Sequence, residues 1–129
     1  MVVLQPTSPL RLAKDINTAS KIISRLKTMS LFSISSSLEH PYETIEIKSK
    51  NNWKHILKKS SKFFRRQDFD IKSFFINGAI YIIHRDLVKK KKIFSHSSHC
   101  FYKMPKHRSL DINDVSEATI VESILKARG

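Results

Sequence analysis

Two short polar segments carry the side chains with which this chain could do chemistry. In residues 108–114, Asp111 alternates with the apolar Leu110 and Ile112, which predicts a strand that presents the Asp111 carboxylate at the carboxyl edge of a sheet. A carboxylate in that place is a candidate catalytic or ligand-binding group. The alternative is that Asp111 and Asn113 are ordinary polar groups of a loop and a helix cap.

The second segment is Asn77-Gly78, which interrupts the longest apolar run in the chain. The run covers residues 74–83, carries no charge and is rich in β-branched and aromatic side chains. It predicts a strand buried on both faces in the middle of a sheet. Asn-Gly is also typical of a two-residue hairpin turn, but the flanking residues do not alternate as half-buried hairpin arms should. A glycine inside such a strand indicates a bulge or a close approach to the backbone, and the neighbouring amide favours a ligand.

The elements that must position these residues begin with a strand, a loop and a helix. Residues 1–4 are apolar, two prolines fix an extended loop, and residues 15–28 have apolar side chains at helical spacing. Residues 30–36 predict the next strand, so the chain starts a β-α-β crossover with a parallel pair of strands. A first strand at the very start of the chain implies neighbouring strands before it.

The middle of the chain combines an exposed strand pattern with a basic segment. Residues 43–48 alternate as an exposed strand that ends at Asn51-Asn52. The basic segment 53–64 is either an amphipathic helix or an excursion from the sheet that packs on another subunit. A short helix at residues 86–88 and a strand at residues 100–104 follow.

The last predicted element is a helix with a clear start signal. Asp114 followed by Glu117 three residues later has the form of an N-terminal cap, and the helix is expected to run to about Ala127. Its apolar stripe consists of Ile120, Val121, Ile124 and Leu125.

Length, charge and cysteine content limit the class of protein. The 129 residues suffice for one domain with one core, and neither a membrane-spanning run nor a signal peptide is found. With the single Cys100, which fits a reducing compartment, a cytoplasmic protein is expected. A net charge of +13 attracts phosphate in nucleic acid, nucleotides, phosphosugars or anionic membranes without distinguishing them.

Two further segments, one rich in lysine and one that contains His and Cys, are best explained without a ligand-binding or metal-binding site. The lysines at residues 89–92 are typical of a solvated face, with a nucleic-acid patch as the alternative. His96, His99 and Cys100 lie within five residues of one another, and no second ligand pair stands elsewhere. Because zinc sites draw ligands from two separated segments, we expect no metal there.

Four segments, in order along nearly the whole chain, resemble the motifs of one enzyme family. They are residues 5–11 (Gln-Pro-Thr-Ser-Pro-Leu-Arg), 66–68 (Arg-Gln-Asp), 77–81 (Asn-Gly-Ala-Ile-Tyr) and 109–113 (Ser-Leu-Asp-Ile-Asn). Together they are similar to the signatures of the N-acylneuraminate cytidylyltransferases, the CMP-sialic acid synthetase family, including members that act on legionaminate and pseudaminate. The Phe-Phe-Ile before Asn77 is more similar to the bacterial legionaminate-type members.

The resemblance implies a Rossmann-like α/β fold of the nucleotide-diphospho-sugar transferase type, with a protruding dimerisation segment at about residues 39–68. The anomeric hydroxyl of a nonulosonic acid would attack the α-phosphorus of CTP, which gives the CMP-sugar and pyrophosphate with magnesium. This chemistry needs charge neutralisation on the transferring phosphoryl group rather than a covalent nucleophile. The implied partners are CTP, the acidic sugar and a second copy of the chain in a homodimer, without membrane or nucleic acid.

The resemblance also implies a metal site. Asp111 matches the family's first metal-binding aspartate and is the catalytic candidate. Asn113 stands where the family has its second metal-binding aspartate; it keeps an oxygen ligand but removes a charge, which should weaken magnesium binding. A further departure is Glu43, where many members place a basic or aromatic residue near the dimer interface.

The sugar site implied by the resemblance draws on three segments. Gln5 and Arg66 match residues that contact the acidic sugar, Arg66 through a charge-assisted pair with the sugar carboxylate. Asn77 and Tyr81 match the wall of the sugar pocket. Arg11 is expected to support the loop after the first strand rather than to touch the substrate.

The front half of the family has no match in this sequence. Its first strand and the Gly- and Lys-rich loop that holds CTP would lie before Met1, and only two glycines occur in the chain. We therefore expect residues 1–129 to be the C-terminal portion of a single cytidylyltransferase domain, incomplete or inactive alone. Uncovered sheet edges and an uncovered helix face should make it unstable or prone to associate.

Two other functions stay open. A small basic module that binds nucleic acid or another anion would explain the charge but none of the four motifs. A non-catalytic partner of a full-length synthetase is the second alternative. Which nonulosonic acid is used does not follow from the sequence.

Overall fold

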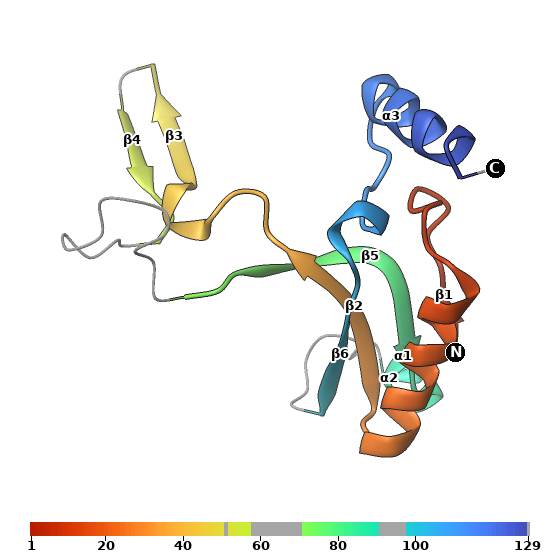
Figure 1. Ribbon diagram of the computed structural model, residues 1–129. Coiled ribbons are helices and arrows are strands. Elements are labelled where there is room, and N and C mark those ends of the chain that lie inside the picture. The colour runs from red at the N-terminus through yellow and green to blue at the C-terminus, as the bar shows by residue number, and fades with distance from the viewer. Residues whose placement is uncertain (51, 58–70, 91–97, 129) are drawn as a thin grey trace. The chain divides into compact units, whose positions relative to one another are not determined.

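The computed structural model describes residues 1–50, 52–57, 71–90 and 98–128 of a mixed α/β protein (Figure 1). The chain forms two compact units, residues 1–35 with 76–129 and residues 36–75. Its elements are β1 (Val2–Val3), α1 (Ala13–Leu26), β2 (Ser30–Ser36), the 3-10 turn η1 (Pro41–Glu43), β3 (Ile45–Ser49), β4 (Asn52–His55), β5 (Phe74–Ile83), α2 (Arg85–Lys89), β6 (His99–Lys103), the 3-10 turn η3 (Lys106–Arg108) and α3 (Val115–Lys126).

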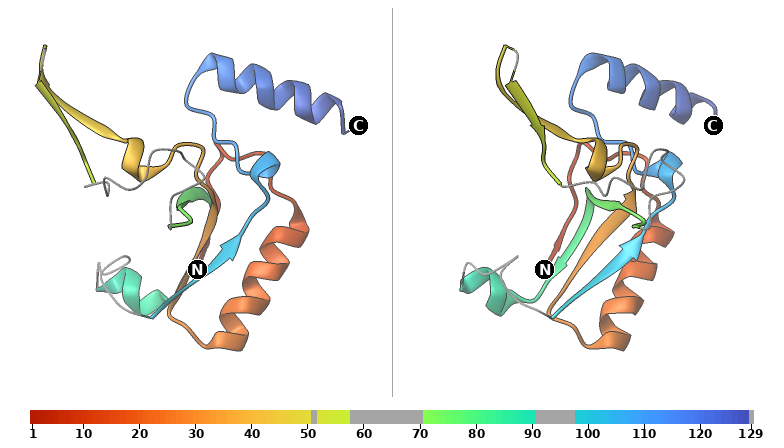
Figure 2. Two further views of the ribbon diagram at one scale, coloured as in Figure 1. Left: turned by 60° about the vertical axis from the view of Figure 1, so that its left-hand side comes forward. Right: turned by 90° about the vertical axis from the view of Figure 1, so that its left-hand side faces the viewer.

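Within the described residues, the first unit is built on a mixed sheet of four strands in the order β1-β5-β2-β6. β1 pairs antiparallel with β5, and β2 pairs parallel with β6. In Figure 2 the arrow of β5 runs opposite to those of β2 and β6. The predicted parallel pair of the first strand with β2 is wrong, because β5 lies between them. β5 has ten residues against two in β1, so it has far more apolar surface to bury and takes an inner position.

The strand prediction for residues 74–83 is confirmed by β5, and the hairpin turn at Asn77-Gly78 is excluded. Burial on both faces is correct only for part of the strand. Residues 77–80 are buried where β5 joins the core, whereas Phe74, Phe75 and Ile76 precede that core and are exposed. Gly78 has a φ of +73°, which departs from regular strand geometry and favours glycine.

Helix α1 contributes an apolar stripe to the core, as its periodicity predicts, and it begins two residues earlier than expected. Ala19 is buried in a cluster with Leu31, Ala79, Ile80, Cys100 and Met104. Three isoleucines of the helix pack against that cluster: Ile16, Ile22 and Ile23. The helix ends at Lys27, which adopts the left-handed conformation common at helix C-termini.

The C-terminal elements agree with the sequence except in one segment. α2, β6 and α3 lie where the patterns place them, and the Asp114 carboxylate accepts from the Glu117 N–H at 2.9 Å as the predicted cap. The predicted strand around Asp111 is wrong: residues 109–112 form no strand, and this segment is held by turns and loop contacts instead. On α3 only Val121 of the apolar stripe is buried, while Ile120 and Leu125 are exposed.

The second unit contains a two-stranded ribbon in its described part. β3 and β4 pair antiparallel with Ile47 opposite Trp53, and Glu46 forms an ion pair with Lys54 at 3.1 Å. A helix over residues 53–64 is therefore wrong for residues 53–55, because the alternating side chains form a strand with one apolar and one charged face. Residues 58–64 lie outside the described part of the chain. Ile47 is 73% exposed and Trp53 is 56% exposed.

None of the helices in the described residues has both the length and the apolar character needed to cross a membrane.

Candidate functional site

Two loops meet at the carboxyl end of the first unit's parallel strands. The loop after β1 carries Ser8, and the loop after β6 carries Asp111. The Ser8 hydroxyl donates to the Asp111 carboxylate at 3.1 Å, and the Ile112 N–H donates to the Thr7 carbonyl at 2.8 Å. Since ligands of open α/β sheets bind outside the carboxyl ends of strands, this junction is the candidate site.

The loop after β1 is held in shape by Arg11. Its guanidinium donates to the Gln5 carbonyl at 2.6 Å, the Ser8 carbonyl at 2.8 Å and the Ala79 carbonyl at 3.4 Å. One side chain thus closes the loop and ties it to β5. The prediction that Arg11 supports this loop is confirmed.

Gln5 makes the close approach that the glycine in β5 indicates. Its side-chain amide lies against Gly78, where the Cβ of any other residue would overlap the Gln5 amide oxygen. We expected a ligand in the space next to Gly78, but in the structure the Gln5 side chain occupies it. Gln5 is partly exposed, so its amide group is also within reach of a ligand.

Asn77 is a buried polar connection in the structure. It is 4% exposed; its amide oxygen accepts from the Ser33 hydroxyl at 2.6 Å, and its amide nitrogen donates to the Ser109 hydroxyl at 2.9 Å. Both ends of the amide are engaged, as buried polar groups require. Asn77 thereby links β2, β5 and the loop after β6.

Tyr81 lies on β5 in the electrostatic neighbourhood of Asp111. Its ring packs edge-on against Phe32 with centroids 5.8 Å apart. Burial raises the pKa of the Tyr81 hydroxyl, and the negative charge of Asp111 raises it further. A protonated phenol near a carboxylate can donate a hydrogen bond to a bound polar ligand.

The two predicted magnesium ligands have suitable donor types. Asp111 is partly exposed and offers a carboxylate, while Asn113 is exposed and offers an amide oxygen. Next to them, the Glu117 carboxylate accepts from the Asn113 N–H at 2.6 Å. Magnesium binds through one or two carboxylates together with substrate oxygens, so this donor set fits, although in the described residues no cluster of three metal-ligating side chains forms.

Arg66, the predicted partner of the sugar carboxylate, lies outside the described residues. The structure therefore joins Gln5, Gly78 and Asp111 around the loop after β1 and leaves the contribution of Arg66 as a prediction.

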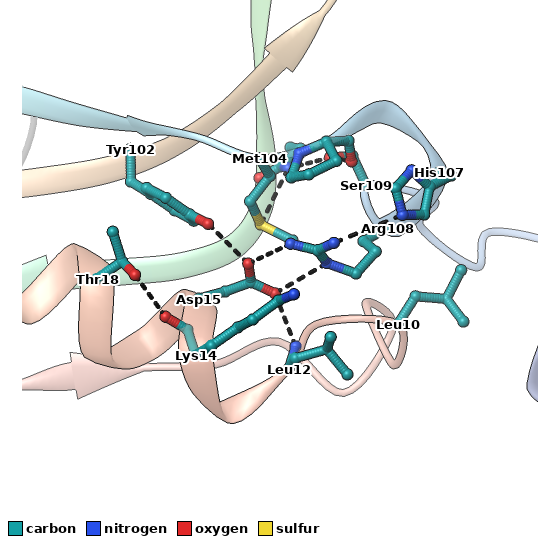
Figure 3. Close-up of polar contacts among 12 residues, drawn as sticks. Leu10, Leu12, Lys14, Asp15, Thr18, Tyr102, Met104, His107, Arg108 and Ser109 are labelled. Atoms are coloured by element: carbon teal, nitrogen blue, oxygen red, sulfur yellow. Dashed lines mark hydrogen bonds and ion pairs between the residues drawn. The ribbon is translucent and has the colours of Figure 1, made fainter. Parts of the chain in front are cut away.

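A buried ion pair beside the site was not predicted from the sequence. Arg108 donates to Asp15 through Nε at 3.1 Å and through Nη2 at 2.6 Å, and the Tyr102 hydroxyl and the Leu12 N–H donate to the same carboxylate at 2.7 and 2.8 Å (Figure 3). Asp15 is fully buried. The helix-start pattern marked Asp15, but no local pattern marks its partner 93 residues away.

These contacts determine the protonation states of Asp15, Tyr102 and Arg108. Burial alone would raise the pKa of Asp15, but the hydrogen bonds from Arg108, Tyr102 and Leu12 outweigh it and lower the pKa. Burial, with the bond to Asp15, raises the pKa of Tyr102 to about 12. The Asp15 carboxylate and the Arg108 guanidinium are therefore both charged across the physiological range.

Comparison with known proteins gives neither a matching family model nor a matching curated protein.

Proposed function

We propose that the chain supplies the acidic-sugar half of a cytidylyltransferase that activates a nonulosonic acid, of the sialic or legionaminic type, with CTP. The observation that carries the proposal is the meeting of Gln5, Gly78 and Asp111 around one loop. The three residues come from separate motifs of the resemblance and from distant parts of the chain. Chance matches to short motifs would have no reason to meet around one loop.

The chemistry of the junction suits an anionic substrate and a transferred phosphoryl group. Gln5 supplies an amide that can bind sugar hydroxyls, and Asp111 supplies the carboxylate at the reacting end. Magnesium bound by Asp111 and Asn113 would neutralise charge on the phosphoryl oxygens. The chain's own residues would bind the sugar and orient its anomeric hydroxyl.

The remainder of the enzyme has to come from elsewhere. The glycine-rich CTP loop that the family uses has no counterpart among the two glycines of this sequence, so other residues, in the same polypeptide or in a partner, would supply the nucleotide half. The β3–β4 ribbon would be part of the dimerisation segment. A reducing, cytoplasmic compartment is part of the proposal. It contains CTP, and the buried Cys100 forms no disulfide.

Binding of N-acetylneuraminate to the chain alone tests the proposal, because it needs no nucleotide half. NMR titration should give amide shifts near Gln5 and Asp111 that saturate with sugar concentration. Gln5→Ala should lower the affinity by about tenfold through the loss of hydrogen bonds to the sugar. Asn17→Ala removes an exposed amide on α1 and is the matched control. Equal affinity of the wild type and Gln5→Ala would reject the sugar site.

One observation favours a second candidate, a basic binding module for nucleic acid. Lys14, Lys21 and Arg25 are exposed on α1, and the only acid of that helix, Asp15, is buried in an ion pair. Binding of single-stranded RNA that weakens steeply with salt, together with no binding of N-acetylneuraminate, would support this candidate instead. Co-purification with a full-length synthetase would support a non-catalytic partner.

A further inference from the structure

The Asp15–Arg108 ion pair takes no part in the proposed reaction, yet it joins the two loops that form the candidate site. Asp15 lies in the first turn of α1, directly after the loop that carries Ser8. Arg108 ends the turn η3, directly before the segment that carries Asp111. We propose that Asp15 and Arg108 are positioning residues that hold these loops in register, so that Ser8 fixes the Asp111 carboxylate; the functional part of this inference rests on the role proposed for Asp111.

The geometry of the pair leaves little freedom. Arg108 contacts both carboxylate oxygens of Asp15, which is the two-bond arrangement that fixes the plane of each group relative to the other. Tyr102 ties the same carboxylate to β6, and the Leu12 N–H ties it to the start of α1. Figure 3 shows these bonds converging on Asp15 from helix, strand and loop.

The contacts at the site itself are too few to set this register. Ser8 reaches Asp111 through one hydrogen bond, and one backbone bond joins Thr7 to Ile112. Each bond adds only a small net stability, because its formation replaces hydrogen bonds that the same groups would make with water. A buried ion pair adds little net stability because burial costs both charges their hydration, but its strict geometry can specify one arrangement.

Arg108→Lys separates positioning from simple charge. Lysine keeps the positive charge but cannot form two parallel bonds to a carboxylate. Arg128→Lys is the matched control, because Arg128 donates to the Leu10 carbonyl of the same loop at 3.3 Å without touching Asp15. Tyr102→Phe is the milder variant, which removes a single donor from Asp15.

Amide hydrogen exchange gives a readout that is independent of function. The Ile112 N–H reports contact between the two loops, and the Ala118 N–H, bonded to the Asp114 carbonyl in α3, is the reference. In Arg108→Lys, exchange at Ile112 should rise on the order of tenfold relative to Ala118. It should rise about threefold in Tyr102→Phe, and it should not change in Arg128→Lys. If Arg108→Lys fails to fold, Tyr102→Phe decides; an equal change at Ile112 and Ala118 in the folded variants overturns the proposal.

Binding of Mn²⁺ alone adds the functional readout. Paramagnetic broadening at the Asp111 amide should require on the order of tenfold more Mn²⁺ in Arg108→Lys than in the wild type or Arg128→Lys, if the carboxylate has lost its position. Wild-type protein without broadening at Asp111 would reject the metal role in the proposed function, and hydrogen exchange at Ile112 would still decide the positioning role. Unchanged Mn²⁺ affinity in Arg108→Lys overturns the functional part.

Discussion

The side-chain amide of Gln5 lies directly on Gly78, in the space that a Cβ atom at residue 78 would need. The contact joins the loop after β1 to the central part of β5. It depends on the missing side chain at residue 78 and on its φ of +73°, both of which favour glycine. The Gln5 side chain of the candidate site therefore packs against a residue of β5 that has no side chain of its own.

Gly78→Ala should destabilise the protein by about 1–3 kcal/mol, because alanine is strained at this φ and would overlap the Gln5 amide. Urea unfolding measures the loss. The double variant with Gln5→Ala should recover part of it, since the overlap is removed and the backbone strain remains. Wild-type stability of the single variant would show that the Gln5 contact does not restrict residue 78.

Arg66→Ala should lower the affinity for N-acetylneuraminate at least tenfold, through loss of a charge-assisted hydrogen bond. Isothermal titration at low salt is a suitable measurement. The neighbouring Arg65→Ala makes the same change in net charge and is the control. Similar losses in both variants would indicate general electrostatic attraction rather than a carboxylate-binding residue.

The Asp15 carboxylate should make the folded protein less stable at acid pH. Because its pKa is lower in the folded state, it stabilises the fold above its unfolded pKa of about 3.9, and this contribution is lost as the pH falls through the lower folded value. Urea midpoints measured between neutral and acid pH should show the decline. Asp15→Asn should flatten this part of the profile, and an unchanged profile would assign the acid sensitivity to other carboxyl groups.

Tyr102 should make the folded protein less stable at alkaline pH. Its pKa is raised from about 10 in the unfolded chain to about 12 in the folded protein. The folded state therefore favours the protonated phenol, and stability falls as the pH rises between these two values. Tyr102→Phe should be less stable at neutral pH but should lose this alkaline decline, which urea midpoints can show. A decline that persists in Tyr102→Phe would have another cause.

The exposed face of the β3–β4 ribbon should mediate self-association. Ile47 and Trp53 lie opposite each other on that face, and an isolated two-stranded ribbon is marginally stable unless it packs on something. Ile47→Lys should weaken this expected self-association by tenfold or more in sedimentation equilibrium, since a charge would replace apolar area that the association buries. Glu46→Gln alters the opposite face and is the control. Fluorescence of the single Trp53 should shift to shorter wavelength on association in the wild type only.

Much of the local structure could be predicted, because its causes lie within a few residues. The apolar segments 30–36 and 100–104 predicted β2 and β6, helical spacing predicted α1, and the Asp114 cap predicted the start of α3. Arg11 was correctly predicted to support its loop. Each of these depends on bonds or burial patterns repeated along one short segment.

The sequence by itself determined the types and boundaries of most elements, the net charge and the residues available for chemistry. Only the tertiary structure decided that β5 separates β1 from β2, that the Asn77 amide bonds to Ser33 and Ser109, and that Asp15 meets Arg108. The physical reason is that periodicity shows which face of a segment is buried but carries no information on what covers it. Strand order and buried ion pairs depend on contacts between distant residues, whose energies become available only when the whole chain is packed.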